Sequence, residues 1–430
     1  MSAGCARLVR ARLGTVPFAI IRKGSTLRKK KRAFALLSTC VLAGGCSSNN
    51  PVFSPGPTPI SATSVVWTET NAANGNAVLA YTRGLNGSLT SIGSTPTGGN
   101  GVGLPTAPGA LPFPIGGATG AVTLAPGGTH LYVADAGTDD VAAFTVSPSG
   151  TLALIARYPT GGTAPASITV DASGRFLYVL NTGSLPSGNN VPGGITGFTI
   201  AANGSLSPIP GSTQTLSARQ YVDPSEVAFS PDGSYLVVTE KATNRIDIFP
   251  APGGVAGPAV SRPSTGNIPF GFGFTPSGTL VVSNAESAQP GNTASTVSSY
   301  STNAGGALTV ISGAVPDNQG AACWITLTSD GAFAYAVNTL SGSLSGYTVG
   351  SNGTLKLLTP GGVTAAQPNT TGPIDNIVTP DNRFLYVLNS MAGKSPGAIA
   401  GFAIGSGGSL TSVPVNVTGL PPGSIGLAVR

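Results

Sequence analysis

The sequence predicts an all-β fold, a seven-bladed β-propeller of four-stranded antiparallel blades. A unit made of a turn, an apolar strand and a polar final residue recurs at intervals of 44 to 59 residues, and self-similarity at such a period indicates a repeat architecture. Gly accounts for 62 of the 430 residues, as many tight turns require. The apolar stretches are short and lack helical periodicity, which favours strands.

Each copy of the unit contains four expected strands. An apolar strand such as "SEVAFS" (225–230) comes first, and a D-G, S-G or D-N turn reverses the chain. The second strand is rich in β-branched and aromatic residues, the third ends in an aromatic residue, and a "G-x-L" turn leads into the fourth. Four short antiparallel strands joined by glycine turns form one propeller blade.

Each second strand ends at a polar residue, so counting these residues gives the number of blades. The ends in six copies are Asp135, Asn181, Glu240, Asn284, Asn338 and Asn389. A degenerate copy at Ser64–Asn71 gives a seventh blade, so the propeller is predicted over residues 64–430. That copy lacks an innermost strand, and the closing "SIGLAV" (Ser424–Val429) is expected to complete it and close the ring. Glu240 is expected to be the single Glu among these strand ends.

Residues 1–45 are predicted to be an export signal. They hold ten Lys and Arg and no acid, which leaves 11 bases and 15 acids for the rest of the chain. The basic pI of 9.2 therefore belongs to this leader, and no basic patch remains for nucleic acid. "LRKKKR" is a positively charged segment, and "AFALLSTCVLAGG" is an apolar one too short to span a bilayer.

The leader ends at "LAGGC", in which small residues precede Cys46. This pattern resembles the lipobox of bacterial lipoproteins, and the resemblance implies a lipid on Cys46 and a location in the cell envelope, at the outer membrane or in the periplasm. A plain secretory signal is the alternative. Residues 46–63 read as a Ser/Pro-rich flexible tether. Cys323 then stays as the one unmodified Cys, which precludes an intramolecular disulfide, and we expect it to be buried beside Trp324.

The predicted pocket lies on the face that carries the loops before each first strand and after each second strand. The polar strand ends belong to this face. Asn and Asp there are expected to cap the following turns, in which case no cofactor is needed. A weaker alternative is a ring of oxygen ligands for Ca²⁺, formed by Asp135, Asn181, Asn284, Asn338 and Asn389.

Charge is concentrated in the fourth blade. The segment 219–247 contains eight of the 26 charges outside the leader, namely Arg219, Asp223, Glu226, Asp232, Glu240, Lys241, Arg245 and Asp247. Glu226 begins one strand and Glu240 ends its neighbour, so we expect the two to lie close together on the pocket face. Paired carboxylates can differ in pKa and act as acid and base. The alternative is a salt-bridged blade edge that involves Lys241, Arg219 and Arg245. Asp247, in the third strand, is expected to pair with Arg245 or to face solvent.

Other chemistries have little support in the sequence. The one His, His130, begins a second strand on the face opposite the predicted pocket, which argues against a Ser-His-Asp triad or a His-ligated metal. "GGNGVG" (98–103) lacks the following Lys-Ser/Thr of a phosphate loop.

Four segments, "FSPDGSYLVVTEKATNRID", "AACWITLTSDGAFAYAVNT", "SGSLSGYTV" and "FLYVLNS", resemble the seven-bladed β-propeller lactonase family, whose best-known activity is that of 6-phosphogluconolactonase. The resemblance covers about residues 64–430 and implies lactone hydrolysis. In that branch blade four carries Gly-Pro-Arg-His before the inner strand and Asn-Glu after the second strand. Glu240 matches the Glu, whereas Ser225 and Glu226 stand in place of the phosphate-binding Arg and the catalytic His.

The leading hypothesis is an exported lactonase in which Glu240 or Glu226 activates water and Lys241 or Arg219 stabilises the oxyanion. The alternative is a non-catalytic propeller that binds a protein or glycan in the cell envelope. In either case we expect a monomer with no nucleic-acid partner, whose contact with a membrane is made through lipid on Cys46.

Overall fold

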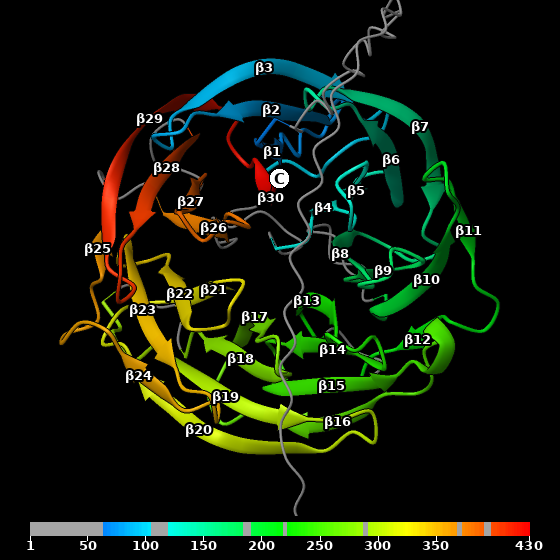
Figure 1. Cartoon of the computed structure of the whole chain (residues 1–430). Helices are drawn as coiled ribbons and strands as arrows, with labels where there is room; N and C mark the ends of the chain where they lie inside the picture. The colour runs from blue at the N-terminus through cyan, green and yellow to red at the C-terminus, as the bar shows by residue number, and fades with distance from the viewer. Residues whose placement is uncertain are drawn as a thin grey trace, which may run out of the picture. The chain divides into compact units, whose positions relative to one another are not determined.

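The computed structural model describes residues 63–104, 119–183, 191–217, 222–286, 291–367, 372–390 and 397–430, all within the compact unit Pro59–Arg430. These residues form seven antiparallel sheets arranged around an axis (Figure 1). The predicted seven-bladed propeller is confirmed. The predicted leader, tether and lipid site at Cys46 lie outside the described residues. Among the described residues no helix is long and apolar enough to cross a membrane.

Within each blade the strands follow one another from the axis outwards. Blade one contains β30 (Ile425–Val429), β1 (Val65–Glu69), β2 (Ala77–Arg83) and β3 (Leu89–Pro96). Blade two contains β4 (Val122–Leu124), β5 (His130–Asp135), β6 (Asp140–Val146) and β7 (Leu152–Pro159). Blade three contains β8 (Pro165–Val170), β9 (Phe176–Asn181), β10 (Gly194–Ile200), β11 (Leu206–Pro208) and the short β12 (Gln214–Thr215), which also pairs with β10.

Blade four contains β13 (Pro224–Phe229), β14 (Tyr235–Glu240), β15 (Arg245–Pro250) and β16 (Val260–Pro263), with a 3-10 turn at Pro252–Gly254. Blade five contains β17 (Pro269–Phe274), β18 (Thr279–Asn284), β19 (Thr296–Thr302) and β20 (Leu308–Pro316). Blade six contains β21 (Ala322–Leu327), β22 (Phe333–Asn338), β23 (Ser343–Val349), β24 (Leu355–Leu357) and β25 (Ala365–Ala366), which pairs with β23. Blade seven contains β26 (Pro373–Val378), β27 (Phe384–Asn389), β28 (Gly397–Ile404) and β29 (Leu410–Leu420).

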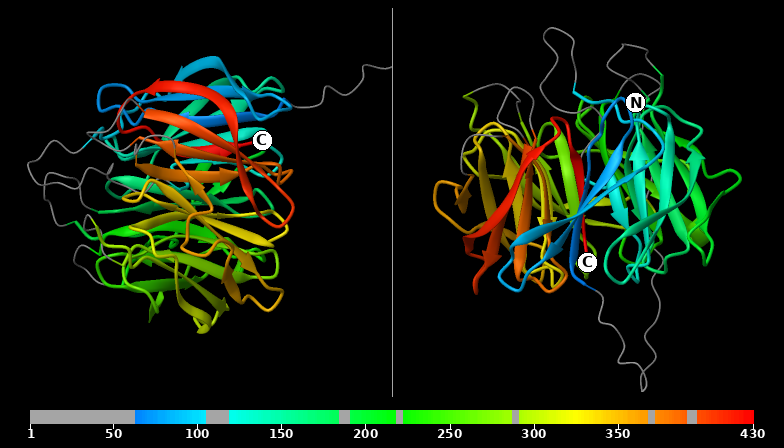
Figure 2. Two further views of the ribbon diagram at one scale, coloured as in Figure 1. Left: turned by 90° about the vertical axis from the view of Figure 1, so that its left-hand side faces the viewer. Right: turned by 90° about the horizontal axis from the view of Figure 1, so that it is seen from above.

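The C-terminal strand closes the ring as predicted. β30 pairs antiparallel with β1, with Val429 opposite Val66 and Ala428 opposite Trp67. Figure 2 shows this last strand, in red, beside the first strands, in blue. The Arg430 guanidinium also donates to backbone carbonyl oxygens of blade two, including that of Gly128 at 3.1 Å. Both ends of the propeller are thereby fixed in one blade.

One hydrogen bond recurs at all seven blade interfaces. A side chain of each blade donates to the carbonyl oxygen of a glycine in the next blade, at 2.7 to 3.1 Å. The donors are Trp67, Tyr132, Tyr178, Arg262, Ser299, Tyr335 and Tyr386, and the acceptors, in the same order, are Gly150, Gly204, Gly254, Gly306, Gly353, Gly408 and Gly87. Each glycine has φ between 76° and 90°, which L side chains rarely adopt. Most of these glycines begin the "G-x-L" turns, so those turns join blades as well as strands.

The inner strands share a bulge at the same position. In six blades the pairing of the inner strand with its neighbour shifts register next to the third residue of the inner strand. A bulge of this kind bends the strand and re-aims a side chain. We call these third residues the inner ring, which consists of Ser167, Glu226, Gly271, Trp324, Asp375 and Leu427.

Candidate active site in the axial cavity

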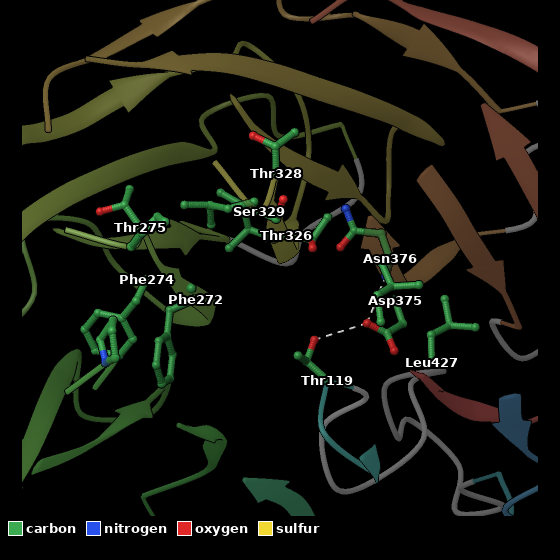
Figure 3. Close-up of a pocket in the computed structure, with 16 residues that line it drawn as sticks. Thr119, Phe272, Phe274, Thr275, Thr326, Thr328, Ser329, Asp375, Asn376 and Leu427 are labelled. Carbon is green, nitrogen blue, oxygen red and sulfur yellow. Dashed lines mark hydrogen bonds between the residues drawn. The ribbon is translucent and has the colours of Figure 1, made fainter. Parts of the chain in front are cut away.

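A cavity of about 410 Å³ lies beside the axis, between the inner strands of blades five, six and seven (Figure 3). Its inner end includes two inner-ring residues, Asp375 and Leu427. Its other end reaches the turns that follow the inner strands, at Pro231, Pro276 and Ser329. This is the face opposite the one predicted from the sequence. Of the loops on the predicted face, residues 105–118, 184–190, 218–221, 287–290, 368–371 and 391–396 lie outside the described residues.

Asp375 is the carboxylate of this cavity. Its side chain is directed towards Thr119 (Figure 3), whose hydroxyl donates to Asp375 Oδ1 at 3.1 Å. The same oxygen accepts the backbone N–H of Asn376 at 2.8 Å. Burial raises the pKa of Asp375 to about 7, although these hydrogen bonds and one from the Leu427 backbone act in the opposite direction. A carboxyl group with a pKa near 7 is suited to general acid–base catalysis at neutral pH.

Glu226 occupies the equivalent inner-ring position of blade four. Its Oε2 accepts the backbone N–H of Phe272, in the next blade, at 2.8 Å. Burial raises the pKa of Glu226 well above its usual range, the Phe272 hydrogen bond lowers it in part, and repulsion from Asp375 raises it further. Blades four and seven therefore each supply a buried carboxyl group, and the charge of Asp375 disfavours ionisation of Glu226. The group with the higher pKa holds a proton while the other titrates, a division of roles typical of acid–base pairs.

Glu240 lies in a different environment, inside blade four. Its carboxylate is fully buried and accepts hydrogen bonds from the backbone N–H of Ser217 at 2.9 Å, from the Ser217 hydroxyl and from Thr243. Its acidic neighbour is Asp247, whose pKa is raised to about 7 by burial and by repulsion from Glu240. No contact between Glu226 and Glu240 is found among the described residues. The acidic neighbour of Glu240 is Asp247, and the acidic charge that acts on Glu226 is that of Asp375.

The expected pairing of Asp247 with Arg245 or with solvent is wrong. Asp247 is fully buried, and Arg245 Nε donates instead to the Ser261 hydroxyl at 2.6 Å. Residues two apart in a strand share one face of the sheet, and on that face the Arg245 guanidinium is bonded to Ser261, the residue opposite Asp247.

Lys241, the predicted oxyanion donor, is held away from the carboxyl pair by other partners. Its Nζ lies 3.1 Å from Asp223 Oδ1 and 4.5 Å from the centroid of the Phe270 ring. Phe270 in turn contacts the inner-ring residue Trp324, edge to face, with ring centroids 4.6 Å apart. Arg219, the other predicted donor, lies outside the described residues.

The polar ends of the second strands are buried. Asn284 Nδ2, for example, donates to the Ser298 hydroxyl at 2.9 Å, and Asn338 Nδ2 donates to Ser345 at 2.8 Å. These amides join neighbouring strands of one blade, whereas the sequence predicted caps for the following turns. Among the described residues no three His, Cys, Asp or Glu side chains are grouped as a metal site. The calcium ring stays a prediction.

Glu240 is not the single Glu among the strand ends. Glu69 ends β1 and pairs with Ile425 next to the same inner-strand bulge, as Glu240 pairs with Pro224. Asn76 Nδ2 donates both to Glu69 and to Asp135 Oδ1 of the next blade, the latter at 2.8 Å. The sequence pattern places the end of this strand at Asn71, two residues after Glu69, because an Asn also fits the end of a strand.

Other expectations about single residues are confirmed. Cys323 is a buried free cysteine, and burial raises the pKa of its thiol to about 12, which makes it a poor nucleophile at neutral pH. His130 begins β5, so it lies on the same face as the axial cavity, but it does not line that cavity, and its ring packs against Gly204 of the next blade.

Asp375 is the site residue that sequence reasoning missed. In the sequence it begins "DNIVT" (375–379), which has the apolar pattern of a first strand. A signal was present, because Asp375 precedes the strand end Asn389 by 14 residues, as Glu226 precedes Glu240. An acid at this spacing is placed in the inner ring by the bulge, but the bulge itself has no residue signature.

Comparison with known proteins gives one family and several solved structures. Residues 75–185 match the model of a family described as lactonase, 7-bladed β-propeller. The match begins in blade one and ends after β9 of blade three, so it includes neither Glu226 nor Asp375. No curated protein gives a significant match.

The solved structures resemble the propeller at low sequence identity. A periplasmic gluconolactonase from Pseudomonas aeruginosa has a TM-score of 0.63 at 18% identity, covering 85% of this chain and 98% of its own. A Bacteroides fragilis protein provisionally described as a 6-phosphogluconolactonase has a TM-score of 0.60 at 20% identity, covering 87% and 100%. A Bacteroides uniformis protein with the same provisional description has a TM-score of 0.60 at 18% identity, covering 86% and 100%. At these identities the likeness shows the fold.

Proposed function

We propose that this protein hydrolyses a lactone in the axial cavity, with Asp375 as general base and Glu226 as general acid. The observation that carries the proposal is the carboxyl pair of the inner ring. Both groups are buried, both come from the same position of their blades, and Asp375 lines a cavity of the size that small ligands occupy.

In the proposed reaction, ionised Asp375 takes a proton from a water molecule as the water oxygen attacks the lactone carbonyl carbon. The ring C–O bond then breaks, and the proton of Glu226 passes to the leaving alkoxide. The product is an open-chain hydroxy acid. The N–H of Phe272 and the hydroxyl of Thr119 position the two carboxyl groups, so little reorganisation is needed during the reaction.

The family match of residues 75–185 and the fold of the Pseudomonas aeruginosa gluconolactonase support lactones as the substrate class. That relative is described as periplasmic, which agrees with the export signal and the lipid anchor at Cys46 that we propose for this chain.

The test is pH-stat titration of lactone hydrolysis by wild type, Asp375→Asn and Glu226→Gln, with and without EDTA. The panel contains sugar lactones, γ-lactones and acyl-homoserine lactones. Because Asp375 must be ionised to act as base, kcat/KM should fall about tenfold per pH unit below its pKa of about 7. Turnover that is lost in EDTA would require an ion, as in the calcium hypothesis. No turnover of any lactone by wild type would favour a propeller that binds a ligand without catalysis.

A further inference from the structure

A second cavity, of about 470 Å³, lies next to the axial one on the same face. It is bounded by turns and strand ends of blades four and five, at residues 231–235, 276–279 and 301–304. Pro231 and Pro276 line both cavities. A ligand in the axial cavity can therefore extend past these two prolines into the second cavity.

The walls of the second cavity carry mainly hydroxyl and amide groups. These belong to Ser234, Tyr235, Ser277, Thr279, Ser301, Thr302 and Asn303. Some are fixed by hydrogen bonds, such as Tyr235 Oη with Thr302 Oγ1 at 2.6 Å. Asn303 Oδ1 accepts the Gly305 N–H at 2.9 Å. Asn303 Nδ2 and Ser301 Oγ have no partner among the described residues and are available to a ligand.

The charged side chains that line the two cavities are acidic. Asp232 lines the second cavity and Asp375 the axial one, and no Lys, Arg or His of the described residues lines either. Hydrogen bonds from Ser230 and Ser234 lower the pKa of Asp232, so it is ionised at neutral pH. A phosphate or carboxylate group on the ligand would meet this charge without a cation to pair with.

We infer that the second cavity is a subsite for an uncharged, hydroxyl-rich unit, a sugar ring, attached to the lactone in the axial cavity. The substrate class is thus an unphosphorylated oligosaccharide lactone. That the substrate contains a lactone rests on the proposed function, whereas the subsite for a sugar ring rests on the second cavity alone.

Two matched variants test the subsite. Ser301→Trp fills the second cavity from an exposed position opposite Thr279. Thr199→Trp places the same side chain at the equivalent exposed position of blade three, opposite Phe176, and serves as the control. Hydrolysis is measured for gluconolactone, cellobionolactone, maltobionolactone and 6-phosphogluconolactone.

We expect a disaccharide lactone to have at least a tenfold higher kcat/KM than gluconolactone, and 6-phosphogluconolactone at least a tenfold lower one. Ser301→Trp should remove the disaccharide advantage and leave gluconolactone unchanged, while Thr199→Trp should change neither. Equal rates for the mono- and disaccharide lactones, or preference for the phosphorylated one, would overturn the inference.

A binding measurement separates failure of the subsite from failure of the proposed catalysis. Calorimetry with cellobiose, maltose, lactose and trehalose needs no turnover. Binding to wild type and Thr199→Trp, lost in Ser301→Trp, supports the subsite even if no lactone is hydrolysed. Absence of binding by all four disaccharides rejects the subsite even if gluconolactone is hydrolysed.

Discussion

Blade four contributes to two pairs of acidic residues. Each pair consists of one buried Glu and one buried Asp, but the two pairs differ in their position relative to a cavity. Glu226 and Asp375 belong to the inner ring of blades four and seven, and Asp375 lines a cavity. Glu240 and Asp247 lie on adjacent strands inside blade four, where neither lines a described cavity. In both pairs burial raises the pKa of the Asp to about 7.

A raised pKa therefore does not distinguish a reactive pair from a structural one in this propeller. The distinction is made by strand position. The third residue of an inner strand lies at a bulge in the strand nearest the axis, whereas the last residue of a second strand is buried one strand further out. Asp375, at the first kind of position, lines a cavity, whereas neither Glu240 nor Asp247 lines a described one.

The largest expected effect is that of Asp375→Asn, which removes the proposed base but keeps the shape of the side chain. We expect kcat/KM for the best lactone to fall about 100-fold or more, with unchanged circular dichroism. Asp247→Asn is the matched control, because it makes the same change in the enclosed pair and should leave kcat/KM within threefold of wild type. A larger loss in Asp247→Asn than in Asp375→Asn would reverse the assignment of the two pairs.

Glu240→Gln should affect stability and spare activity. The amide cannot accept all the hydrogen bonds that Ser217 and Thr243 donate to the carboxylate, so we expect unfolding free energy to fall by about 1–3 kcal/mol. Urea denaturation measures the loss, and kcat/KM should stay within threefold of wild type. An inactive but fully stable Glu240→Gln protein would return the site to Glu240, as the sequence suggested.

The pKa values also predict how stability changes with pH. Asp375 and Asp247 titrate near 7 in the folded protein, and Asp135 and Asp317 near 6, against about 3.9 for Asp in an unfolded chain. Between pH 4 and 7 the folded state thus binds more protons than the unfolded state, and stability falls as pH rises. The urea midpoint should be higher at pH 5 than at pH 8, and an unchanged or rising midpoint would contradict these raised pKa values.

Asp247→Asn should narrow that pH difference. The amide stands in for the protonated carboxyl group, so the variant should gain up to about 4 kcal/mol over wild type at pH 8, at about 1.36 kcal/mol per pKa unit, and less at pH 5. The comparison is made by urea titration of both proteins at both pH values. A loss of stability at pH 8 would mean that the ionised carboxylate is itself stabilising.

The sequence was sufficient for the fold because every blade repeats its own turns and strand pattern. The hairpin turns, the apolar strands and the closing strand Ser424–Val429 are local signals, and the structure agrees with each. The site was predicted in part. Glu226 was selected for its charge, but its partner lies 149 residues away in blade seven. Asp375 and Glu226 are brought to the inner strands around one axis by ring closure and a shared bulge, neither of which a short segment of sequence encodes.

The smallest expected effect belongs to Lys241→Met, and it decides between the two faces of the propeller. The ion pair of Lys241 with Asp223 is partly exposed, and such pairs contribute less than about 1 kcal/mol, as does the contact with the Phe270 ring. Methionine preserves the packing on that ring and removes the charge. If chemistry takes place in the axial cavity, which Lys241 does not line, kcat/KM should change less than threefold. A loss of 100-fold with normal stability would instead place an oxyanion next to Lys241, on the face predicted from the sequence, because only a group that contacts the developing charge has so large an effect on rate.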